Sequence, residues 1–295
     1  MRCRLDLDEL EILVAVVDHG SFSAAAAAMN IQVAKVSRVI NKIEQKLGVT
    51  LLNRTTRRLQ LTDEGHYFVG SIRKFLLEIE QTEESLLTRG DTPKGKLRID
   101  AASPFIIHQI IPLVDKFKRE YPQITLELTS HEEFVDLLEN KTDIAIRIGK
   151  MPDSTLSARS LGKSPLHIVA SPDYLAKNGI PKSVKDLSTH TIIGFSGPKV
   201  LNQWGLKECN YVDPSISASN GEAVRKLALT SIGIACLSNF MVHKDIEQGS
   251  LVPLLVNERT PVPDREQISA VFYKSSSVAC RVSVFIDFLR KNISL

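Results

Sequence analysis

The sequence has few cysteines and lacks the common metal-binding and phosphate-binding motifs. Its four cysteines lie far apart, with no CxxC pair and no metal-like pairing with histidine, which argues against a zinc site or a disulfide framework. Ordinary packing is the preferred interpretation of these thiols, and a redox-sensing pair stays open. There is also no glycine-rich phosphate loop. We therefore expect neither a bound metal nor a cofactor.

Long apolar runs are missing as well. No uncharged stretch approaches the roughly 20 residues that span a bilayer. The apolar run at 12–17 follows Asp6, Asp8, Glu9 and Glu11, where a signal peptide would carry basic residues. We expect a cytoplasmic protein with no membrane partner.

Two sequence patterns begin like catalytic motifs and then fail. The run Gly194–Pro198 resembles a nucleophile elbow, but Pro198 stands where the motif requires glycine. The run His131–Val135 begins like a zinc-protease helix, but Val135 occupies the second ligand position. Because no coherent acid–base set stands out elsewhere, we expect that the protein is not an enzyme.

Basic residues are concentrated near the N-terminus. The 295 residues are too many for one small core, so two or three structural units are expected. Residues 1–62 carry 9 Lys/Arg against 6 Asp/Glu, whereas residues 63–295 carry 28 of each. Such a local excess is typical of a small DNA-binding module on a neutral body.

Apolar periodicity predicts three helices in this basic region. The first spans Leu7–Asp18. Ser21 is a good N-cap for a second helix over Phe22–Met29. The third spans Gln32–Leu47 and ends at Gly48.

The third helix has two chemically different faces. The apolar face consists of Val36, Ile40, Ile43 and Leu47. The nearly opposite stripe consists of Ala34, Ser37, Arg38 and Asn41. A buried face backing a polar, basic face is typical of a helix in a DNA major groove. An ordinary solvated helix face is the alternative.

The next segment favours the DNA-binding interpretation. Residues 51–62 predict two short strands around a basic tip, a wing that reaches phosphates or the minor groove. Thr62 then caps a helix that continues to Arg89, a rod about 40 Å long. We expect the apolar stripe of this helix to pair with a second copy, in a homodimer or homotetramer. The stripe is mostly apolar and consists of Phe68, Ile72, Phe75, Leu76, Ile79, Glu83 and Leu86.

Strand-like and helix-like segments alternate in the rest of the chain. Predicted strands cover 97–101, 124–129, 143–148, 167–170, 192–195, 215–218, 233–237 and 268–273; predicted helices cover 104–121, 132–140, 222–230 and 278–292. The helix over 104–121 would turn Ile107, Ile110, Ile111, Val114 and Phe117 inward. Such alternation predicts α/β structure with parallel sheets covered by helices.

Motifs along the whole chain resemble those of the LysR-type transcriptional regulator family. They include Gly20–Ser23, Val36–Ile40, Leu51–Arg54, Leu61–Gly65, Asp143–Gly149 and Ala170–Leu175. The resemblance implies an N-terminal winged helix-turn-helix, a long linker helix and a two-lobed, periplasmic-binding-protein-like α/β effector domain. It places the DNA-binding domain at 1–62, the linker at 63–91 and the effector domain at 92–295. Lobe I would comprise 96–163 and 268–295 and lobe II 164–267, with crossings near 163–166 and 264–268.

One departure from the family pattern lies at the start of the third helix. Gln32 and Val33 stand where the family usually has Ser-Gln, and Lys35 replaces a small residue. Gln32 could read an adenine and Val33 a thymine methyl in double-stranded DNA. The predicted DNA-binding residues are Ser21, Ser23, Gln32, Val33, Ala34, Ser37, Arg38, Asn41, Lys42, Arg54, Arg57 and Arg58.

Effectors of α/β sheets bind beyond the carboxyl ends of strands. Hydroxyls, amides and helix starts at those ends suit a small carboxylate, to which Arg147 would add a full charge. A structural ion pair of Arg147 with Glu222 or Asp143 is the alternative. The predicted effector-binding residues are Ser103, Pro104, Phe105, Ser130, Arg147, Gly149, Phe195, Ser196, Ser219, Asn220 and Gly221.

The sequence thus predicts a sequence-specific DNA-binding transcription regulator controlled by a small-molecule effector. A solute-binding or carrier protein without DNA function is the rival hypothesis, and the local basic excess at 35–58 argues against it.

Overall fold

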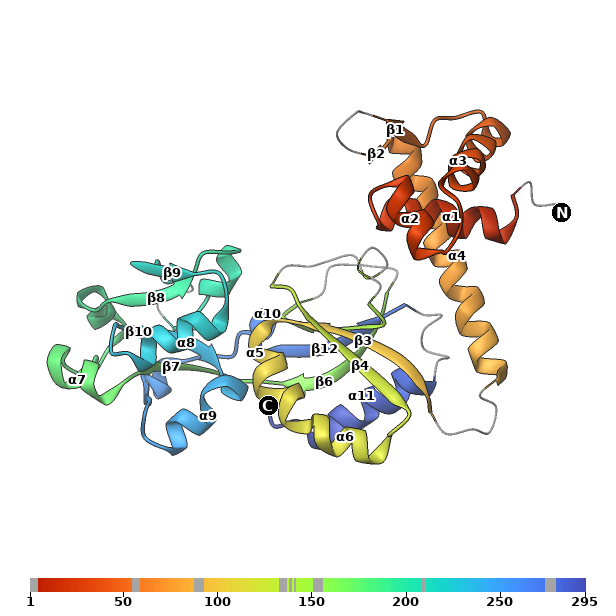
Figure 1. Cartoon of the computed structure of the whole chain (residues 1–295). Coiled ribbons are helices and arrows are strands. Elements are labelled where there is room, and N and C mark those ends of the chain that lie inside the picture. Colours follow the sequence, from red (N-terminus) through yellow and green to blue (C-terminus); the bar gives the residue numbers. More distant parts are fainter. Residues whose placement is uncertain are drawn as a thin grey trace. The chain divides into compact units, whose positions relative to one another are not determined.

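The computed structural model describes residues 5–54, 59–87, 93–132, 137, 140, 142–150, 156–207, 209, 211–273 and 280–295 (Figure 1). The chain divides into two compact units, Met1–Leu87 and Thr88–Leu295. Each has its own apolar core, so each is described by itself.

Three short helices open the first unit, as the sequence predicts. They are α1 (Leu7–Asp18), α2 (Phe22–Ala28) and α3 (Val33–Leu47). The Ser21 hydroxyl accepts a hydrogen bond from the Ala24 amide at 3.1 Å, which caps α2. Gly48 ends α3 with φ +71°, a left-handed conformation that favours glycine.

The core of this unit lies behind α3. Val36, Ile40 and Ile43 are fully buried, as are Leu13 and Val16 of α1. This confirms the predicted apolar face of the third helix. The small side chains of α2 let it pack closely, with Ala25 and Ala26 buried among the others.

A two-stranded wing follows α3. Strand β1 (Leu52–Arg54) pairs antiparallel with β2 (Leu59–Leu61). One oxygen of the Glu44 carboxylate accepts hydrogen bonds from the amides of Leu51 (2.7 Å) and Leu52 (3.1 Å). The end of α3 therefore fixes the start of the wing, while the predicted basic tip at 55–58 lies outside the described residues.

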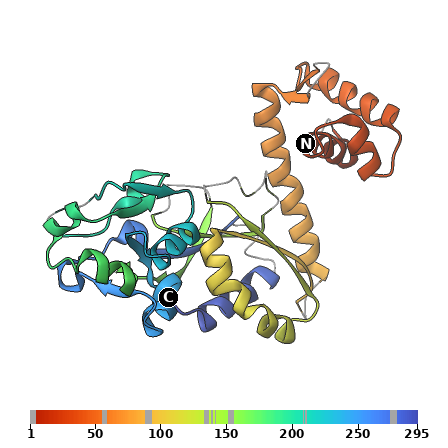
Figure 2. The same cartoon turned by 60° about the vertical axis from the view of Figure 1, so that its left-hand side comes forward.

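Helix α4 (Asp63–Leu87) is long, as predicted (Figure 2). The Thr62 hydroxyl accepts a hydrogen bond from the Gly65 amide at 2.9 Å, which confirms Thr62 as its cap. The predicted apolar stripe divides in two, because Phe68 and Ile72 pack against the core of their own unit. Phe75, farther along, is 49% exposed.

The second unit contains two five-stranded sheets, one in each lobe. In lobe I the strand order is β4-β3-β5-β12-β6, and in lobe II it is β11-β7-β10-β8-β9. The lobe I strands are β3 (Gly95–Ala101), β4 (Ile124–Ser130), β5 (Ile144–Ile148), β6 (Ser157–Lys163) and β12 (Gln267–Phe272). The lobe II strands are β7 (Leu166–Ala170), β8 (Ile192–Phe195), β9 (Ile216–Ala218), β10 (Ile234–Ser238) and β11 (Val252–Leu254).

Both sheets are mixed, which corrects the prediction of parallel sheets. Neighbours β3–β4, β3–β5, β8–β9 and β8–β10 are parallel. Strand β12 runs antiparallel to β5 and β6, and β7 runs antiparallel to β10 and β11. These two strands begin where the chain has just passed from one lobe to the other, so no crossover helix fixes their direction.

The helical segment after β3 departs from the predicted regular helix. It consists of α5 (Ser103–Phe105), a π turn (Ile106–Ile110), a 3₁₀ turn (Ile111–Leu113) and α6 (Val114–Glu120). Pro112 lacks the amide hydrogen that a regular helix needs at this point. The wider π turn shifts the face, so Ile107 and Ile111 are 43% and 53% exposed rather than inward-facing.

Further helices complete the two lobes. They are α7 (Pro172–Asn178), α8 (Gly221–Leu229), α9 (Asn239–Glu247), α10 (Pro263–Glu266) and α11 (Cys280–Asn292), with 3₁₀ turns at Val184–Thr189, Lys199–Asn202 and Val256–Glu258. The sequence did not predict β6, β11, α7 or α9, and its helix over 132–140 lies mostly outside the described residues. Figures 1 and 2 show α6 and α11 together beside the lobe I sheet, where Phe117 packs edge-on against Phe285 at 5.2 Å between ring centroids.

One apolar core spans both lobes and includes Phe105 and Phe285 of lobe I and Val224, Leu237 and Phe240 of lobe II. A separate apolar cluster, which includes Trp204, lies within lobe II. Among the described residues, no single helix is long and apolar enough to cross a membrane, although α1 and α2, bent by 119°, pass that test as a pair.

Candidate functional site

The predicted DNA-reading stripe lies on the accessible side of α3. Ala34, Arg38 and Asn41 are exposed, and Ser37 is half-buried. The Arg38 side chain rests on its own helix, with Nε donating to the Ala34 carbonyl at 3.2 Å. Because Arg38 is exposed on this side of α3, its guanidinium is accessible from outside, which is what base-edge recognition needs.

The start of α3 presents the residues that depart from the family pattern. Gln32 occupies the N-cap position, and its side chain makes no capping hydrogen bond. Val33 follows it and is 45% exposed. Ser21 and Ser23, at the start of α2, are also exposed. These side chains are accessible to a ligand as large as DNA.

Lys42 has a partner inside its own unit. Its ammonium forms an ion pair with the Glu9 carboxylate of α1, which Lys46 also contacts at 3.0 Å. The hydrogen bond from Lys42 lowers the pKa of Glu9 to about 2, helped by Lys46 and the Asp6 amide against the effect of burial. The Lys42 side chain is still 53% exposed, so the ion pair joins α1 to α3 without hiding the charge.

The predicted wing arginines fall largely outside the described part of the chain. Arg57 and Arg58 lie outside the described residues, and so does the side chain of Arg54. Only the backbone of Arg54, paired with Leu59, belongs to the described hairpin.

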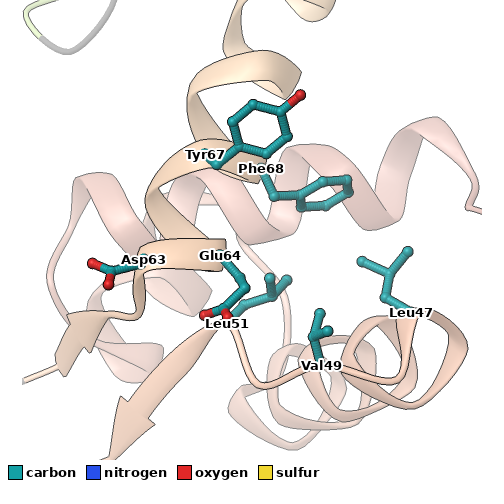
Figure 3. Close-up of a pocket in the computed structure, with 7 residues that line it drawn as sticks. All are labelled: Leu47, Val49, Leu51, Asp63, Glu64, Tyr67 and Phe68. Atoms are coloured by element: carbon teal, nitrogen blue, oxygen red, sulfur yellow. The ribbon is translucent and has the colours of Figure 1, made fainter.

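An apolar recess lies at the base of the wing (Figure 3). It is lined by Leu47, Val49, Leu51, Asp63, Glu64, Tyr67 and Phe68. Figure 3 shows Leu47 and Val49 across the recess from Phe68. Among the described residues that line it, the charged groups are the carboxylates of Asp63 and Glu64, which disfavour a DNA phosphate or an anionic effector.

In the second unit, Arg147 forms a buried ion pair with Asp100. Its Nη1 lies 2.8 Å from Asp100 Oδ2, and the two side chains are 7% and 0% exposed. His131 Nδ1 contacts the other oxygen of Asp100 at 2.6 Å. One buried carboxylate therefore joins the ends of β3, β5 and β4.

Asp100 is a partner of Arg147 that was not predicted. Glu222 instead contacts His108 at 2.8 Å and Arg225 at 2.9 Å. Asp143 accepts from the Arg98 amide at 2.8 Å. Strands β3 and β5 are adjacent and parallel, so Asp100 and Arg147 come from neighbouring strands.

Ser103 and Ser130 come together as the strand register requires. Strands β3 and β4 pair with Ala101 opposite Ser130, and the two serine hydroxyls are 2.9 Å apart. The Ser103 amide also donates to Glu132 Oε1 at 3.1 Å. This cluster at one sheet edge contains two predicted effector residues and a carboxylate that was not predicted.

Pro104 and Phe105 lie deeper than the prediction requires. Phe105 is fully buried and packs edge-on against Phe240, with 5.5 Å between ring centroids. Pro104 is also buried, and a methyl group at Gly221 would lie 3.1 Å from it. We therefore assign Phe105 to the core between the lobes rather than to an effector surface.

The predicted lobe II residues follow β8 and β9. Asn220 accepts from the Ala223 amide at 2.9 Å and caps α8, while Ser196 and Ser219 are exposed. The guanidinium of Arg265 lies over the half-buried ring of Phe195, with its Cζ 5.7 Å from the ring centroid. Phe195 thus rests on a buried cation of α10, a neighbour that the sequence pattern did not reveal.

Gly149 has a structural reason to be glycine. Its φ is +102°, and a Cβ there would lie 2.5 Å from the Asp264 carbonyl oxygen. Its amide donates to the Gln267 carbonyl at 2.7 Å. Gly149 therefore permits close contact between the end of β5 and the segment that returns from lobe II.

The described part of the chain contains neither a disulfide nor a cluster of metal-binding side chains. Cys209, Cys236 and Cys280 are not in disulfides, and no group of three His, Cys, Asp or Glu could hold a metal there. Burial raises the pKa of the Cys236 thiol, which lowers its reactivity.

The sequence missed Asp100, Glu132 and Arg265. Asp100 had a signal, since it is the one acid within the apolar strand 97–101 and a buried carboxylate needs partners. Glu132 belongs to the failed zinc motif and to the predicted helix over 132–140, and neither pattern indicated its contact with Ser103. Arg265 had no signal, because its neighbours come from distant parts of the chain.

Comparisons with known proteins agree with this architecture. A model described as "Bacterial regulatory helix-turn-helix protein, lysR family" matches residues 7–66, and one described as "LysR substrate binding domain" matches residues 90–294. The HTH-type transcriptional regulator CrgA of Neisseria meningitidis serogroup C is 42% identical over 286 residues, covering 96% of this chain and 95% of CrgA. The HTH-type transcriptional regulator PtxR of Pseudomonas aeruginosa is 32% identical, covering 98% of this chain and 93% of PtxR.

A solved structure supports the same conclusion. The structure of CrgA, a LysR-type transcriptional regulator from Neisseria meningitidis, has a TM-score of 0.65 and 40% sequence identity to this chain. The match covers 98% of this chain and 99% of that one. The chain therefore belongs to the LysR family of bacterial regulatory helix-turn-helix proteins.

Proposed function

We propose that this protein regulates transcription by sequence-specific binding of double-stranded DNA, under the control of a small-molecule effector. The observation that carries the DNA function is α3, with a fully buried face and an opposite exposed face bearing Arg38 and Asn41. A helix with this contrast beside a wing fits the major groove. A solute-binding or carrier protein has no use for it.

A gel-shift experiment tests the DNA function. The protein should retard DNA from upstream of its own gene at concentrations that leave random DNA of equal length free, at matched salt. Arg57→Ala in the wing should weaken binding to all sequences and reduce the salt slope by about one. Equal affinity for upstream and random DNA would favour the carrier hypothesis.

For the effector we propose a small carboxylate. We place it at the sheet edge where Ser103 and Ser130 meet, with Ser196, Ser219 and Asn220 as contacts from lobe II. The serine hydroxyls and the Ser103 amide are donors that suit a carboxylate. Arg147 supports the site indirectly, since its charge is paired with Asp100.

Thermal unfolding with a panel of small mono- and dicarboxylates tests this site. Trp204, the single tryptophan, is buried in lobe II and reports on this unit by its fluorescence. A binding carboxylate should raise the midpoint of the wild type. The double variant Ser103→Ala/Ser130→Ala should lose that rise, whereas Ser188→Ala, a control at an exposed serine of lobe II, should keep it.

We also propose that the protein is a cytoplasmic homo-oligomer, a homodimer or homotetramer, assembled through α4. The part of α4 that its own core does not cover includes Phe75, Leu76 and Ile79. Pairing with a second copy would bury this surface and present two wings to a partly palindromic site. Ile79→Asp should shift the protein toward monomer in light scattering, and an unchanged oligomer would remove α4 as the interface.

A further inference from the structure

The donors at Ser103 already hold a carboxylate of the protein itself. Glu132 Oε1 accepts from the Ser103 amide at 3.1 Å and also from the Ser103 hydroxyl. The same hydroxyl lies 2.9 Å from the Ser130 hydroxyl. The group that meets these donors is thus chemically equivalent to the proposed effector carboxylate.

Glu132 is held there by its neighbour in the chain. His131 Nδ1 lies 2.6 Å from Oδ1 of Asp100, which is fully buried and also pairs with Arg147. This contact anchors the backbone just beyond β4 next to the end of β3. Because His131 is fixed in this way, the Glu132 carboxylate, one residue later, lies within reach of Ser103.

Glu132 differs from Asp100 in how easily it can leave. Glu132 is exposed, whereas Asp100 is 0% exposed. Moving an exposed carboxylate into water restores its hydration, while uncovering a buried one breaks an ion pair. The contact between Ser103 and Glu132 can therefore open without disturbing the ion pair beneath it.

We propose that Glu132 is a specificity-determining residue of the effector site, an internal carboxylate that occupies Ser103 until an effector carboxylate replaces it. This inference rests on the proposed function, which assigns Ser103 to the effector. When a ligand consists of little more than a carboxylate, its binding replaces one carboxylate at Ser103 by another, and the net free energy of binding is small. A ligand whose remaining atoms make further contacts gains enough to displace Glu132. The site thereby discriminates against the simplest carboxylates.

Removing Glu132 should convert this site into one that binds acetate. The experiment follows thermal unfolding of the full-length protein by Trp204 fluorescence, with sodium acetate compared with sodium chloride at equal ionic strength and neutral pH. Glu132→Ala should gain a saturable, acetate-specific rise of roughly 3–5 °C when acetate exceeds its Kd tenfold. The wild type should show little rise.

Three further variants make the result specific. Glu120→Ala removes another exposed acid of lobe I, at the end of α6, and should behave as wild type. Glu132→Gln keeps a neutral acceptor at Ser103 and should gain a smaller rise than Glu132→Ala. Adding Ser103→Ala to Glu132→Ala should reduce the rise, because the hydroxyl donor is gone.

The inference is overturned if acetate and chloride act alike on Glu132→Ala, or if wild type and Glu132→Ala respond equally. Its failure differs from that of the proposed function, which is tested on wild-type protein with the carboxylate panel. If a panel member stabilises the wild type through Ser103 but Glu132→Ala gains no acetate response, only the internal-carboxylate inference falls. If Glu132→Ala gains the response and no panel member stabilises the wild type, the occupation of Ser103 by Glu132 stands, while its replacement by an effector carboxylate falls together with the proposed ligand class.

Discussion

Arg38 in the first unit and Arg147 in the second were both predicted to contact a ligand, yet the structure places them in opposite settings. Arg38 is exposed on α3, and its described contact is a hydrogen bond to a carbonyl of its own helix. Arg147 is 6% exposed and paired with a carboxylate that is fully buried. An arginine in a sequence motif therefore does not by itself indicate a ligand contact. Whether its charge is available to a ligand depends on the charges of the side chains around it.

The difference reflects what each region must recognise. DNA phosphates and base edges are reached from outside, so the DNA-binding unit leaves cations on its surface. In the second unit this one charge pair is enclosed, because Asp100 neutralises Arg147 inside the protein, whereas other charged side chains such as Arg119 and Asp115 are exposed. Under the proposed function, hydroxyls and amides at the strand ends would contact the small effector.

Breaking the internal pair should have the largest effect. Arg147→Ala leaves the Asp100 carboxylate buried without its arginine, which should lower the free energy of unfolding of the second unit by about 3–5 kcal/mol. Chemical denaturation followed by Trp204 fluorescence measures this. Arg38→Ala is the matched control and should unfold like wild type. A wild-type midpoint for Arg147→Ala would refute the contrast between the two arginines.

A smaller effect is expected where α4 meets the wing. A Cβ at Gly65 would lie 2.2 Å from the Leu51 carbonyl oxygen, whereas nothing lies within 4 Å of one at Gly70 of the same helix. Gly65→Ala should therefore destabilise the first unit by roughly 1–3 kcal/mol, and Gly70→Ala should be neutral or stabilising by up to about 1 kcal/mol. Thermal unfolding followed by circular dichroism compares the two variants. Equal effects would show that the close approach does not constrain the wing.

The smallest effect concerns Glu9, the buried carboxylate of the DNA-binding unit. Its pKa is lowered from 4.5 to about 2, so its ionised form stabilises the fold above pH 4.5. That contribution is lost as the pH falls toward 2. Glu9→Gln keeps a residue able to complete the cap of α1 but loses the ion pairs with Lys42 and Lys46. Its unfolding midpoint should be roughly 1–3 °C below wild type at neutral pH.

The pH dependence supplies the control for Glu9. Thermal unfolding of wild type and Glu9→Gln should be measured at a series of decreasing pH values. The difference between their unfolding midpoints should become smaller once the pH is below 4.5. A gap that stays constant to the lowest pH measured would mean that the charge of Glu9 contributes nothing.

The helices of the DNA-binding unit could be predicted because local signals suffice there. Apolar spacing, the Ser21 and Thr62 caps and Gly48 each fix a boundary within a few residues. The helix after β3 could not be predicted to the same level, because Pro112 and the π turn before it change which residues face inward. Sheet direction was missed for a different reason, since β7 and β12 depend on where the chain changes lobe.

In the candidate sites, too, the features set by local sequence could be predicted and those set by contacts between distant segments could not. The exposed face of α3 followed from helical periodicity, and the meeting of Ser103 with Ser130 followed from strand ends at one edge. The partners Asp100, Glu132 and Arg265 depend on strand register and on contacts between the lobes. Periodicity carries no information about such contacts.

DNA binding by Arg38→Ala is the measurement that tests the central claim most directly. Affinities of wild type and Arg38→Ala for upstream and random DNA should be compared by gel shift at matched salt. The account predicts that the variant folds normally, loses about 1–3 kcal/mol of affinity for the specific site and loses less on random DNA. Wild-type affinity and specificity in Arg38→Ala would contradict the assignment of this face of α3 to the major groove.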